Sequence, residues 1–242
     1  MHKQVLRVKN IVKSYDGRTV VDQVSFSLTQ GSIVGLLGSN GAGKTTIFYM
    51  AVGFINPDQG QILLDDSEIT NLAMYQRAQL GIGYLPQENC IFRKLTVEDN
   101  ILAILEVQKM KRSAKKERLD ELLESLEVTH IRKSYGYALS GGERRRVEIA
   151  RCLASNPKFL LLDEPFAGVD PLVVGDIQEI IQRLSTQNIG ILINDHNIRE
   201  TLNITHHAHI INKGKVLLSG SPEVIINSDL ARQVYFGEKF KF

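Results

Sequence analysis

The nine residues GSNGAGKTT, from Gly38 to Thr46, restrict the possible fold more than any other stretch of the chain. They contain three glycines and one lysine, and they follow directly after the apolar run SIVGLL. A backbone with so few side chains can wrap its N–H groups closely around an anion. If a helix begins behind such a loop, its N-terminus adds positive partial charge at the same point. The stretch therefore predicts a buried strand, an anion-binding loop and a helix, in that order.

The spacing of the glycines and the lysine also matches a known phosphate-binding motif. Gly38, Gly43, Lys44 and Thr45 fit the P-loop pattern G-x-x-x-x-G-K-[ST] without a mismatch. In such a loop the lysine reaches the β- and γ-phosphates, and the hydroxyl after it binds Mg²⁺. A plain glycine-rich turn is the alternative, but the strand before it and the helix after it favour the P-loop. The expected phosphate-binding residues are Gly38, Ser39, Asn40, Gly41, Ala42, Gly43, Lys44, Thr45 and Thr46.

Composition narrows the class of protein further. With 43% hydrophobic and 23% charged residues, the 242-residue chain can bury the core of one or two domains. Its net charge of +2 gives no basic field, so no nucleic-acid partner is expected. No secretion signal is visible at the N-terminus, and no apolar run approaches the ~20 residues of a membrane span. Cys90 and Cys152 form no CxxC pair, so we expect buried, reduced thiols and a cytoplasmic location.

Strand and helix patterns alternate around the P-loop. The expected strands cover residues 4–12, 20–28, 32–38, 61–65, 158–165 and 189–196. A turn is expected at Asp16-Gly17 and a hairpin across Lys213-Gly214. Helices are expected from about Lys44 to Gly53 and around the apolar positions 177, 180, 181 and 184. This order predicts an α/β fold with a mostly parallel sheet.

The middle of the chain has a helical period instead. Two apolar faces are visible, one formed by Val97, Ile101, Ile104 and Leu105, and one by Leu119, Leu122, Leu123 and Leu126. Between them lies KMKRSAKKER, residues 109–118, which we interpret as a solvated helix end and loop rather than a nucleic-acid patch. Residues 96–155 are therefore expected to form a helical subdomain inserted into an α/β core of residues 1–95 and 156–242.

Two acidic residues follow the apolar strand FLLLDEP. Asp163 and Glu164 lie at its C-terminal end, where ligands bind in open α/β sheets. Asp163 is the candidate that holds Mg²⁺, and Glu164 is the candidate general base for the attacking water. A solvated strand end is the alternative, but it is disfavoured by the presence of a P-loop in the same chain.

A second candidate anion site lies in LSGGE, where Ser140 and Glu143 have capping-box spacing at a helix start. Gly141 and Gly142 lower the helix propensity at this N-terminus. Glycines are expected there if a ligand must approach the backbone closely. The three arginines that follow, Arg144 to Arg146, require nothing beyond a solvated helix face. Sequence spacing leaves open whether the P-loop and Ser140–Gly142 act on the same nucleotide.

Six motifs together carry a resemblance to a known family. GSNGAGKTT, YLPQE, LSGGE, LLLDEP, AGVD and NDH occur here in the order found in ATP-binding cassette (ABC) ATPases, and the similarity covers essentially the whole chain. The resemblance implies a RecA-like P-loop NTPase core with an N-terminal antiparallel β subdomain and a helical insertion. It also implies a head-to-tail homodimer in which LSGGE of one chain faces the ATP·Mg²⁺ held by the P-loop of the other.

The same resemblance assigns roles to single residues. Tyr15 is similar to the aromatic residue that stacks on adenine, with a plain strand-end tyrosine as the alternative. Gln87 is similar to the glutamine that contacts Mg²⁺ and senses the membrane partner, and Asp170 to an aspartate that communicates across the dimer. His196 is similar to the switch histidine at the γ-phosphate, although an isolated histidine is more often structural. With Lys44 and Glu164, His196 completes the expected catalytic set.

Within the family, several segments resemble the ATPases of lipopolysaccharide export, including IFRKLTVEDN and the ending VYFGEKF. Ser39 stands where that branch has proline and Asn194 where threonine is usual, and branched-chain amino-acid import ATPases are the nearest alternative. A soluble ABC protein acting on ribosomes or chromosomes would carry tandem cassettes or coiled coils, and a small-molecule kinase would not need LSGGE. The resemblance implies docking of membrane permease subunits near Phe92 and Arg93 at the cytoplasmic face of the inner membrane. A core phenylalanine is the alternative for Phe92.

Overall fold

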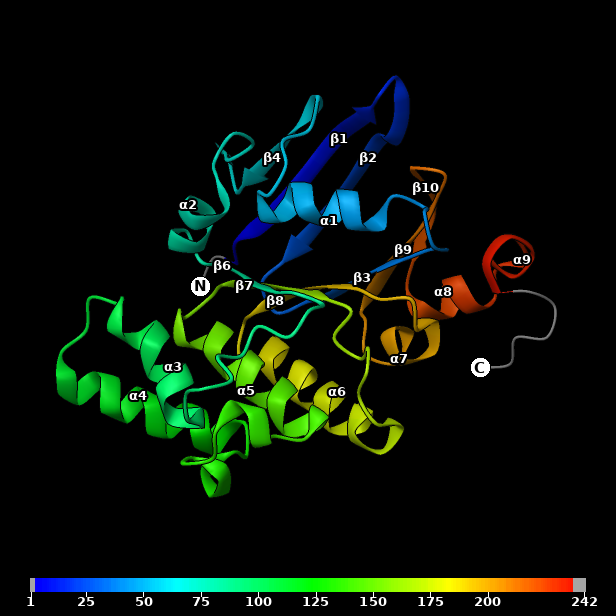
Figure 1. Cartoon of the computed structure of the whole chain (residues 1–242). Coiled ribbons are helices and arrows are strands. Elements are labelled where there is room, and N and C mark those ends of the chain that lie inside the picture. Colours follow the sequence, from blue (N-terminus) through cyan, green and yellow to red (C-terminus); the bar gives the residue numbers. More distant parts are fainter. Residues whose placement is uncertain (1–2, 237–242) are drawn as a thin grey trace.

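A computed structural model of the chain describes residues 3–236 and contains two sheets (Figure 1). The first has four antiparallel strands in the order β2-β1-β4-β5, and the second has six strands in the order β10-β9-β3-β8-β7-β6. The α/β class, the mostly parallel sheet and the N-terminal antiparallel sheet are confirmed.

The antiparallel sheet is built from the alternating segments that precede and follow the P-loop. Its strands are β1 (Val5–Tyr15), β2 (Arg18–Thr29), β4 (Gln59–Leu64) and β5 (Ser67–Glu68). Asp16 and Gly17 join β1 to β2 with φ angles of 48° and 77°, the left-handed backbone that a tight hairpin turn needs. Alternate side chains such as Leu6 and Val8 are buried on one face, as strand periodicity requires.

The six-stranded sheet positions the candidate site. Its parallel strands are β3 (Ile33–Leu37), β6 (Ile82–Leu85), β7 (Phe159–Asp163), β8 (Gly190–Asn194) and β9 (His207–Asn212), and β10 (Lys215–Gly220) is antiparallel to β9. Because β3, β7 and β8 run in one direction, their carboxyl ends meet at one edge. Asp163 there lies opposite Asn194 in the ladder.

Both faces of this sheet are covered, which explains its continuously apolar strands. Helix α1 (Lys44–Val52) and the antiparallel sheet cover one face, where Phe159 and Leu161 are buried. Helix α6 (Pro171–Thr186) and the helical segment cover the other, where Leu160 and Leu162 are buried (Figure 1). Outside the helical segment, the other helices are α2 (Met74–Gln79), α7 (Ile198–Leu202), α8 (Pro222–Ile226), α9 (Asp229–Ala231) and a π-helical turn, Arg232–Phe236.

The helical segment contains α3 (Val97–Glu106), α4 (Arg112–Ser125) and α5 (Gly141–Ala154), with 3-10 turns at Thr129–Ile131 and Gly136–Ala138. The predicted apolar faces are confirmed, because Leu119, Leu122, Leu123 and Leu126 are all buried. These leucines belong to the same apolar cluster as Leu160 of the sheet. The division into a helical subdomain and an α/β core stays a prediction.

Several expectations need correction. Arg145 is buried rather than solvated, and both cysteines are half-buried rather than buried. Phe92 is 48% exposed, so it is not a core residue. Strand β6 and helices α2, α7, α8 and α9 were not predicted. Of the ending VYFGEKF, residues 237–240 lie outside the described residues.

Candidate functional site

The P-loop connects β3 to α1 as a tight cradle. Gly38, Gly41 and Gly43 have φ angles of 154°, 77° and 103°, which side-chain-bearing residues rarely adopt. A Cβ atom at Gly38 would lie 2.3 Å from the Ile211 carbonyl oxygen, and one at Gly43 would lie 2.6 Å from that of Val20. Gly41 faces open space instead. The first and last of these glycines are therefore required by packing, and the middle one by backbone conformation.

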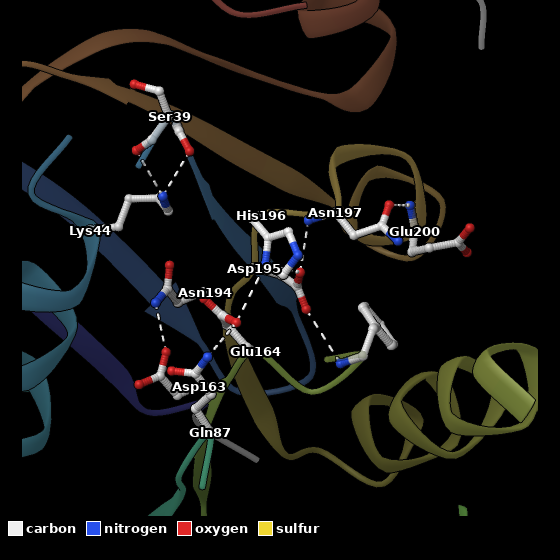
Figure 2. A network of polar contacts seen from close by, with 12 residues as sticks. Ser39, Lys44, Gln87, Asp163, Glu164, Asn194, Asp195, His196, Asn197 and Glu200 are labelled. Atoms are coloured by element: carbon white, nitrogen blue, oxygen red, sulfur yellow. Dashed lines mark hydrogen bonds and ion pairs between the residues drawn. The ribbon is translucent and has the colours of Figure 1, made fainter. Parts of the chain in front are cut away.

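Lys44 is folded across this cradle and almost fully buried. Its Nζ donates to the carbonyl oxygens of Gly38 at 2.7 Å and Ser39 at 3.1 Å (Figure 2). Burial lowers the pKa of Lys44, and the carboxylates of Glu164, Asp195 and Asp163 oppose that shift. The result is a fixed cation beside bare backbone, on the same edge as the acidic strand end.

Asp163 is the last residue of β7 and is 3% exposed. Its Oδ1 accepts a 2.7 Å hydrogen bond from Nδ2 of Asn194 on the neighbouring strand. Burial raises the pKa of Asp163, and the bond from Asn194 acts in the opposite direction. The buried Oδ1 of Asn194 has no hydrogen-bond partner among the described residues, so this strand edge is left with a free acceptor beside a carboxylate.

Glu164 follows in a left-handed backbone conformation, with φ of 45°. For a non-glycine residue this conformation is uncommon, and the strain is characteristic of functional sites. Its N–H donates to the Asn194 carbonyl at 2.7 Å, which fixes the turn. The Glu164 carboxylate accepts a 2.7 Å bond from Gln87 Nε2 and lies 3.3 Å from His196 Nδ1 (Figure 2). Three of the expected site residues, from three separate segments, therefore converge at one carboxylate.

Asp195, the middle residue of NDH, is a buried acid without a predicted role. Its Oδ1 accepts from the Asn197 N–H at 2.7 Å, and its Oδ2 accepts from the Phe166 N–H at 3.3 Å. Burial raises the pKa of Asp195 despite these bonds. The side chain ties the loop that carries Glu164 to the loop that carries His196.

Arg145 was wrongly expected on a solvated helix face. Its guanidinium is buried and lies 3.1 Å from the carboxylate of Glu148, which is 1% exposed. It donates to four backbone carbonyls, those of Pro86, Asp163, Glu164 and Pro165, at 3.1–3.4 Å. One side chain thus holds the segment that leads to Gln87 and the segment that carries Asp163 and Glu164.

The LSGGE segment forms the predicted capping box at the start of α5. The Ser140 N–H and hydroxyl both donate to Glu143 Oε2, at 2.8 and 2.7 Å. A Cβ atom at Gly142 would lie 2.6 Å from Val173 Cγ1, whereas one at Gly141 would meet almost nothing. Across residues 3–236, Ser140–Gly142 shares no hydrogen bond with the P-loop. The two candidate anion sites are therefore not joined within one chain.

Two further expected residues, Tyr15 and Asp170, lie away from the Glu164 carboxylate. Tyr15 ends β1 and is 46% exposed, with the Lys13 ammonium 5.6 Å from its ring. Asp170 caps α6 by accepting from the Leu172 N–H at 2.9 Å. Neither residue shares a hydrogen bond or ion pair with Asp163, Glu164 or Asp195.

The geometry can now be compared with known proteins. The ABC transporter family model matches residues 21–167. A probable ABC transporter ATP-binding protein of Azorhizobium caulinodans is 58% identical over 231 residues, which cover 96% of this chain and 82% of that protein. The chain belongs to the ABC transporter ATP-binding family. The lipopolysaccharide export system ATP-binding protein LptB of Haemophilus influenzae is 54% identical over 238 residues, 98% of this chain and 99% of that protein.

Solved structures of this family share the fold. An ATP-binding cassette of an ABC transporter in its ADP conformation has a TM-score of 0.87 at 28% identity, and the match covers 98% of this chain and 100% of that one. A bacterial ABC transporter cassette solved as a dimer has a TM-score of 0.78 at 22% identity, over 90% and 98%. As a member of the family, the chain binds nucleotide and hydrolyses ATP.

The site of this ABC ATPase suits Mg²⁺ only together with a nucleotide. Within residues 3–236, no three His, Cys, Asp or Glu side chains form a metal site on their own. Mg²⁺ is usually held by one or two carboxylates plus phosphate oxygens and water. Asp163 and the Thr45 hydroxyl, at the phosphate-binding edge, fit that donor set.

A groove that begins beside Gln87 has a volume of about 880 Å³. It is lined largely by apolar and aromatic side chains, among them Phe54, Tyr84 and Ile104, and by Gln87 and Arg151. Phe92 and Arg93 do not line it, but the Arg151 guanidinium stacks on the Phe92 ring 4.5 Å from its centroid. None of the helices within residues 3–236 combines the length and hydropathy that a membrane crossing requires.

Proposed function

We propose that this chain is the ATP-hydrolysing subunit of a transporter that exports lipopolysaccharide from the inner membrane. The supporting observation is 54% identity to an LptB protein over 98% of this chain and 99% of the relative. The relative with 58% identity carries only a general ABC transporter name, so it does not point to another substrate. Substrate choice is assigned by similarity, because no described side chain need touch the transported lipid.

In this proposal the P-loop binds the phosphates of ATP through the backbone of Gly38–Thr46, and Lys44 compensates the β- and γ-phosphate charge. Tyr15 would stack on the adenine from its exposed strand end. Thr45, Gln87 and Asp163 would hold Mg²⁺, which supplies charge neutralisation on the phosphates when bound. The Asn194 amide would keep the Asp163 carboxylate aimed at that position.

Glu164 is proposed as the general base. A general base must lie within hydrogen-bond reach of the attacking water. The left-handed backbone of Glu164 and the hydrogen bond from Gln87 hold the Glu164 carboxylate at the edge of the sheet where the P-loop lies. His196, 58% exposed at its side chain, is proposed to contact the γ-phosphate. Asp170, at the start of α6, is proposed to communicate with the second subunit.

The proposed assembly is a head-to-tail homodimer with two nucleotides. Ser140, Gly141 and Gly142 lie at a helix N-terminus that shares no hydrogen bond with the chain's own P-loop. A second chain would place this terminus against the γ-phosphate of the first. A cassette of the same fold was solved as a dimer, which is compatible with pairing of two chains.

Membrane permease subunits are the proposed partners, docked at the groove lined by Tyr84, Gln87 and Arg151 on the cytoplasmic face of the inner membrane. Phe92 and Arg93 would border the contact. An exposed aromatic ring beneath an arginine is typical of an interface hot spot. Gln87 lines this groove and also bonds to Glu164, so a docked partner would lie one side chain from the proposed base.

The test combines capture with transport. The tagged chain is purified from detergent-solubilised membranes, its partners are identified, and the complex is reconstituted in proteoliposomes that contain lipopolysaccharide. ATP-dependent release of lipopolysaccharide, absent with Glu164→Gln, is the expected result. Release of another lipid, or stimulation by a branched-chain amino acid, would overturn the substrate assignment.

Phe92→Ala tests docking separately from chemistry. Because the ring is exposed, the variant should fold and hydrolyse ATP in solution, yet capture the membrane subunits poorly. Leu230→Ala is a control of similar exposure, since Leu230 in α9 is 42% exposed and Phe92 is 48% exposed. Normal capture and transport by Phe92→Ala would contradict the docking assignment.

A further inference from the structure

The turn between α3 and α4 carries a concentration of positive charge that nucleotide chemistry does not explain. Residues 107–116, called the basic turn below, contain five Lys or Arg residues and no acidic residue. Lys115 is paired with Glu106 at 2.7 Å. The other four, Lys109, Lys111, Arg112 and Lys116, are exposed and form no ion pair within residues 3–236. Figure 1 shows the basic turn at the opposite end of the molecule from α8 and α9.

Apolar side chains are exposed among these cations. Val107 is 77% exposed and Met110 is 38% exposed. Both line a hollow of about 1170 Å³, together with Leu80, itself 38% exposed. Exposed aliphatic side chains interleaved with lysines are typical of segments that rest in a lipid headgroup layer.

The hollow also continues into the proposed docking groove. Ala78 and Ser155 line both, so the basic turn and the groove share one continuous surface. A permease bound in the groove would bring this surface toward the bilayer in which the permease is embedded. The position of the basic turn and its positive charge therefore both favour a contact with lipid.

We propose that the basic turn contacts the anionic phospholipid headgroups of the membrane surface when the subunit is docked, with Val107 and Met110 entering the headgroup layer. The orientation rests on the proposed function, because it places the docking groove toward the membrane. An acidic protein segment or a nucleic acid would also be attracted by the four free cations. A nucleic acid would not account for exposed aliphatic side chains among the cations, and the chain's small net charge argues against a general polyanion binder. The continuity of the hollow with the proposed docking groove favours lipid over an acidic protein segment.

The expected affinity is modest. Each Lys or Arg near an anionic leaflet strengthens binding about fivefold at physiological salt. Four such cations give a factor on the order of 10²–10³, so the isolated chain should bind anionic vesicles weakly and reversibly. Salt should weaken the binding, because exposed charges are screened over about 10 Å at 0.1 M.

The direct test is vesicle flotation of the full chain at low salt. Phosphatidylcholine vesicles containing 30% phosphatidylglycerol should carry the chain, and pure phosphatidylcholine vesicles should not. The quadruple variant K109Q/K111Q/R112Q/K116Q should lose binding by roughly 10²-fold or more. The matched control K3Q/K9Q/R18Q/R199Q removes the same charge from other exposed positions and should retain it.

Insertion of the apolar residues has its own readout. The chain has no tryptophan, so Val107→Trp introduces a single tryptophan, which can be excited apart from the tyrosines, at the most exposed apolar position of the turn. Its emission should shift to shorter wavelength with anionic vesicles and be quenched by brominated lipid. An unchanged emission maximum during flotation would remove Val107 from the proposal.

Three outcomes would overturn the proposal as a whole: equal flotation of the two quadruple variants, equal binding to neutral vesicles, or binding of single-stranded DNA or polyglutamate by the basic turn without binding of vesicles. Flotation uses neither a permease nor lipopolysaccharide, so its failure does not depend on the transport assignment. Conversely, vesicle binding with transport of another substrate would preserve the lipid contact and reject only the proposed substrate.

Discussion

Replacing Arg145 by methionine should destabilise the protein strongly, although the position looks like one of three interchangeable surface arginines. The methionine keeps much of the side-chain volume but removes the charge and all five donor contacts. Glu148, 1% exposed, would then be a buried carboxylate without its cation. Four backbone carbonyls would also lose a donor.

Breaking a buried ion pair by removing one partner typically costs about 3–5 kcal/mol. For a chain of this size, 1 kcal/mol lowers the melting temperature by roughly 2–4 °C. Arg145→Met should therefore melt about 6–20 °C below the wild type. The double variant Arg145→Met/Glu148→Met removes both charges and should recover most of this loss, since an apolar pair of similar volume is often as stable as the ion pair it replaces.

The assay is thermal unfolding followed by circular dichroism, with ATP hydrolysis measured on each folded variant. Hydrolysis should stay low even in the double variant, because the carbonyls of Pro86 and Glu164 remain without the arginine that holds both segments. Glu148→Gln alone is a useful control for the acid. A melting point for Arg145→Met within 2 °C of wild type would refute the buried-pair reasoning. Full activity in the double variant would refute the positioning of Glu164 through Arg145.

Three further predictions follow from the site and the core. Glu164→Gln should bind ATP yet hydrolyse it about 10²–10⁴-fold more slowly and accumulate as an ATP-bound dimer; near wild-type turnover would exclude it as the base. Lys44→Ala and Gly142→Asp subunits, each inactive alone, should recover partial ATPase activity when mixed, because one composite site of the mixed dimer is intact; an active Gly142→Asp homodimer would contradict a phosphate-facing glycine. Burial and the neighbouring His207 lower the pKa of His209 to about 4. In the unfolded chain this histidine has its ordinary pKa of ~6.5, so the unfolded chain binds the proton first as the pH falls. Between pH 7 and 5 the free energy of unfolding should fall by up to about 2 kcal/mol from this group, and urea titrations should show that part missing in His209→Gln.

The parts of the fold that follow a local rule could be predicted from the sequence. The strand–loop–helix of the P-loop, the leucine face of α4 and the capping box of α5 each depend on residues within one or two helical turns. The strand end that carries Asp163 and Glu164 was also visible as an apolar run that ends in acids, and the P-loop in the same chain favoured a functional interpretation of those acids. The order of these elements was sufficient to predict an α/β class.

The parts that depend on tertiary contacts could not be predicted in the same way. Arg77 is fully buried and donates to the carbonyls of Met50 and Ala51 at the end of α1, across about 26 residues of sequence. Arg145 reaches Pro86, 59 residues away. A buried arginine is tolerated only where the fold assembles enough acceptors around it. Local periodicity does not report such acceptors, so Arg145 was expected on a solvated face and Arg77 was not singled out.

The three consecutive arginines of α5 show how one helix brings the separate contacts of the site together. Successive residues of a helix point about 100° apart, so only Arg145 of the three is buried, while Arg146 pairs with Asp176 at 2.6 Å nearer the surface. Glu148 follows Arg145 by three residues and Arg151 follows Glu148 by three, so each side chain is a surface neighbour of the one before it.

These positions link three parts of the molecule. Arg145 holds the backbone around Glu164, Glu148 accepts from the Cys90 N–H at 3.0 Å, and Arg151 stacks on Phe92. The same helix begins at Ser140, in the segment proposed to face the nucleotide of a second subunit. A partner that moved residues 90–92 would therefore act on one 14-residue helix that also supports the proposed base and presents the LSGGE segment. Because an α-helix is stiff along its axis, this shared element gives docking and hydrolysis a physical connection without requiring a chain of side-chain rearrangements.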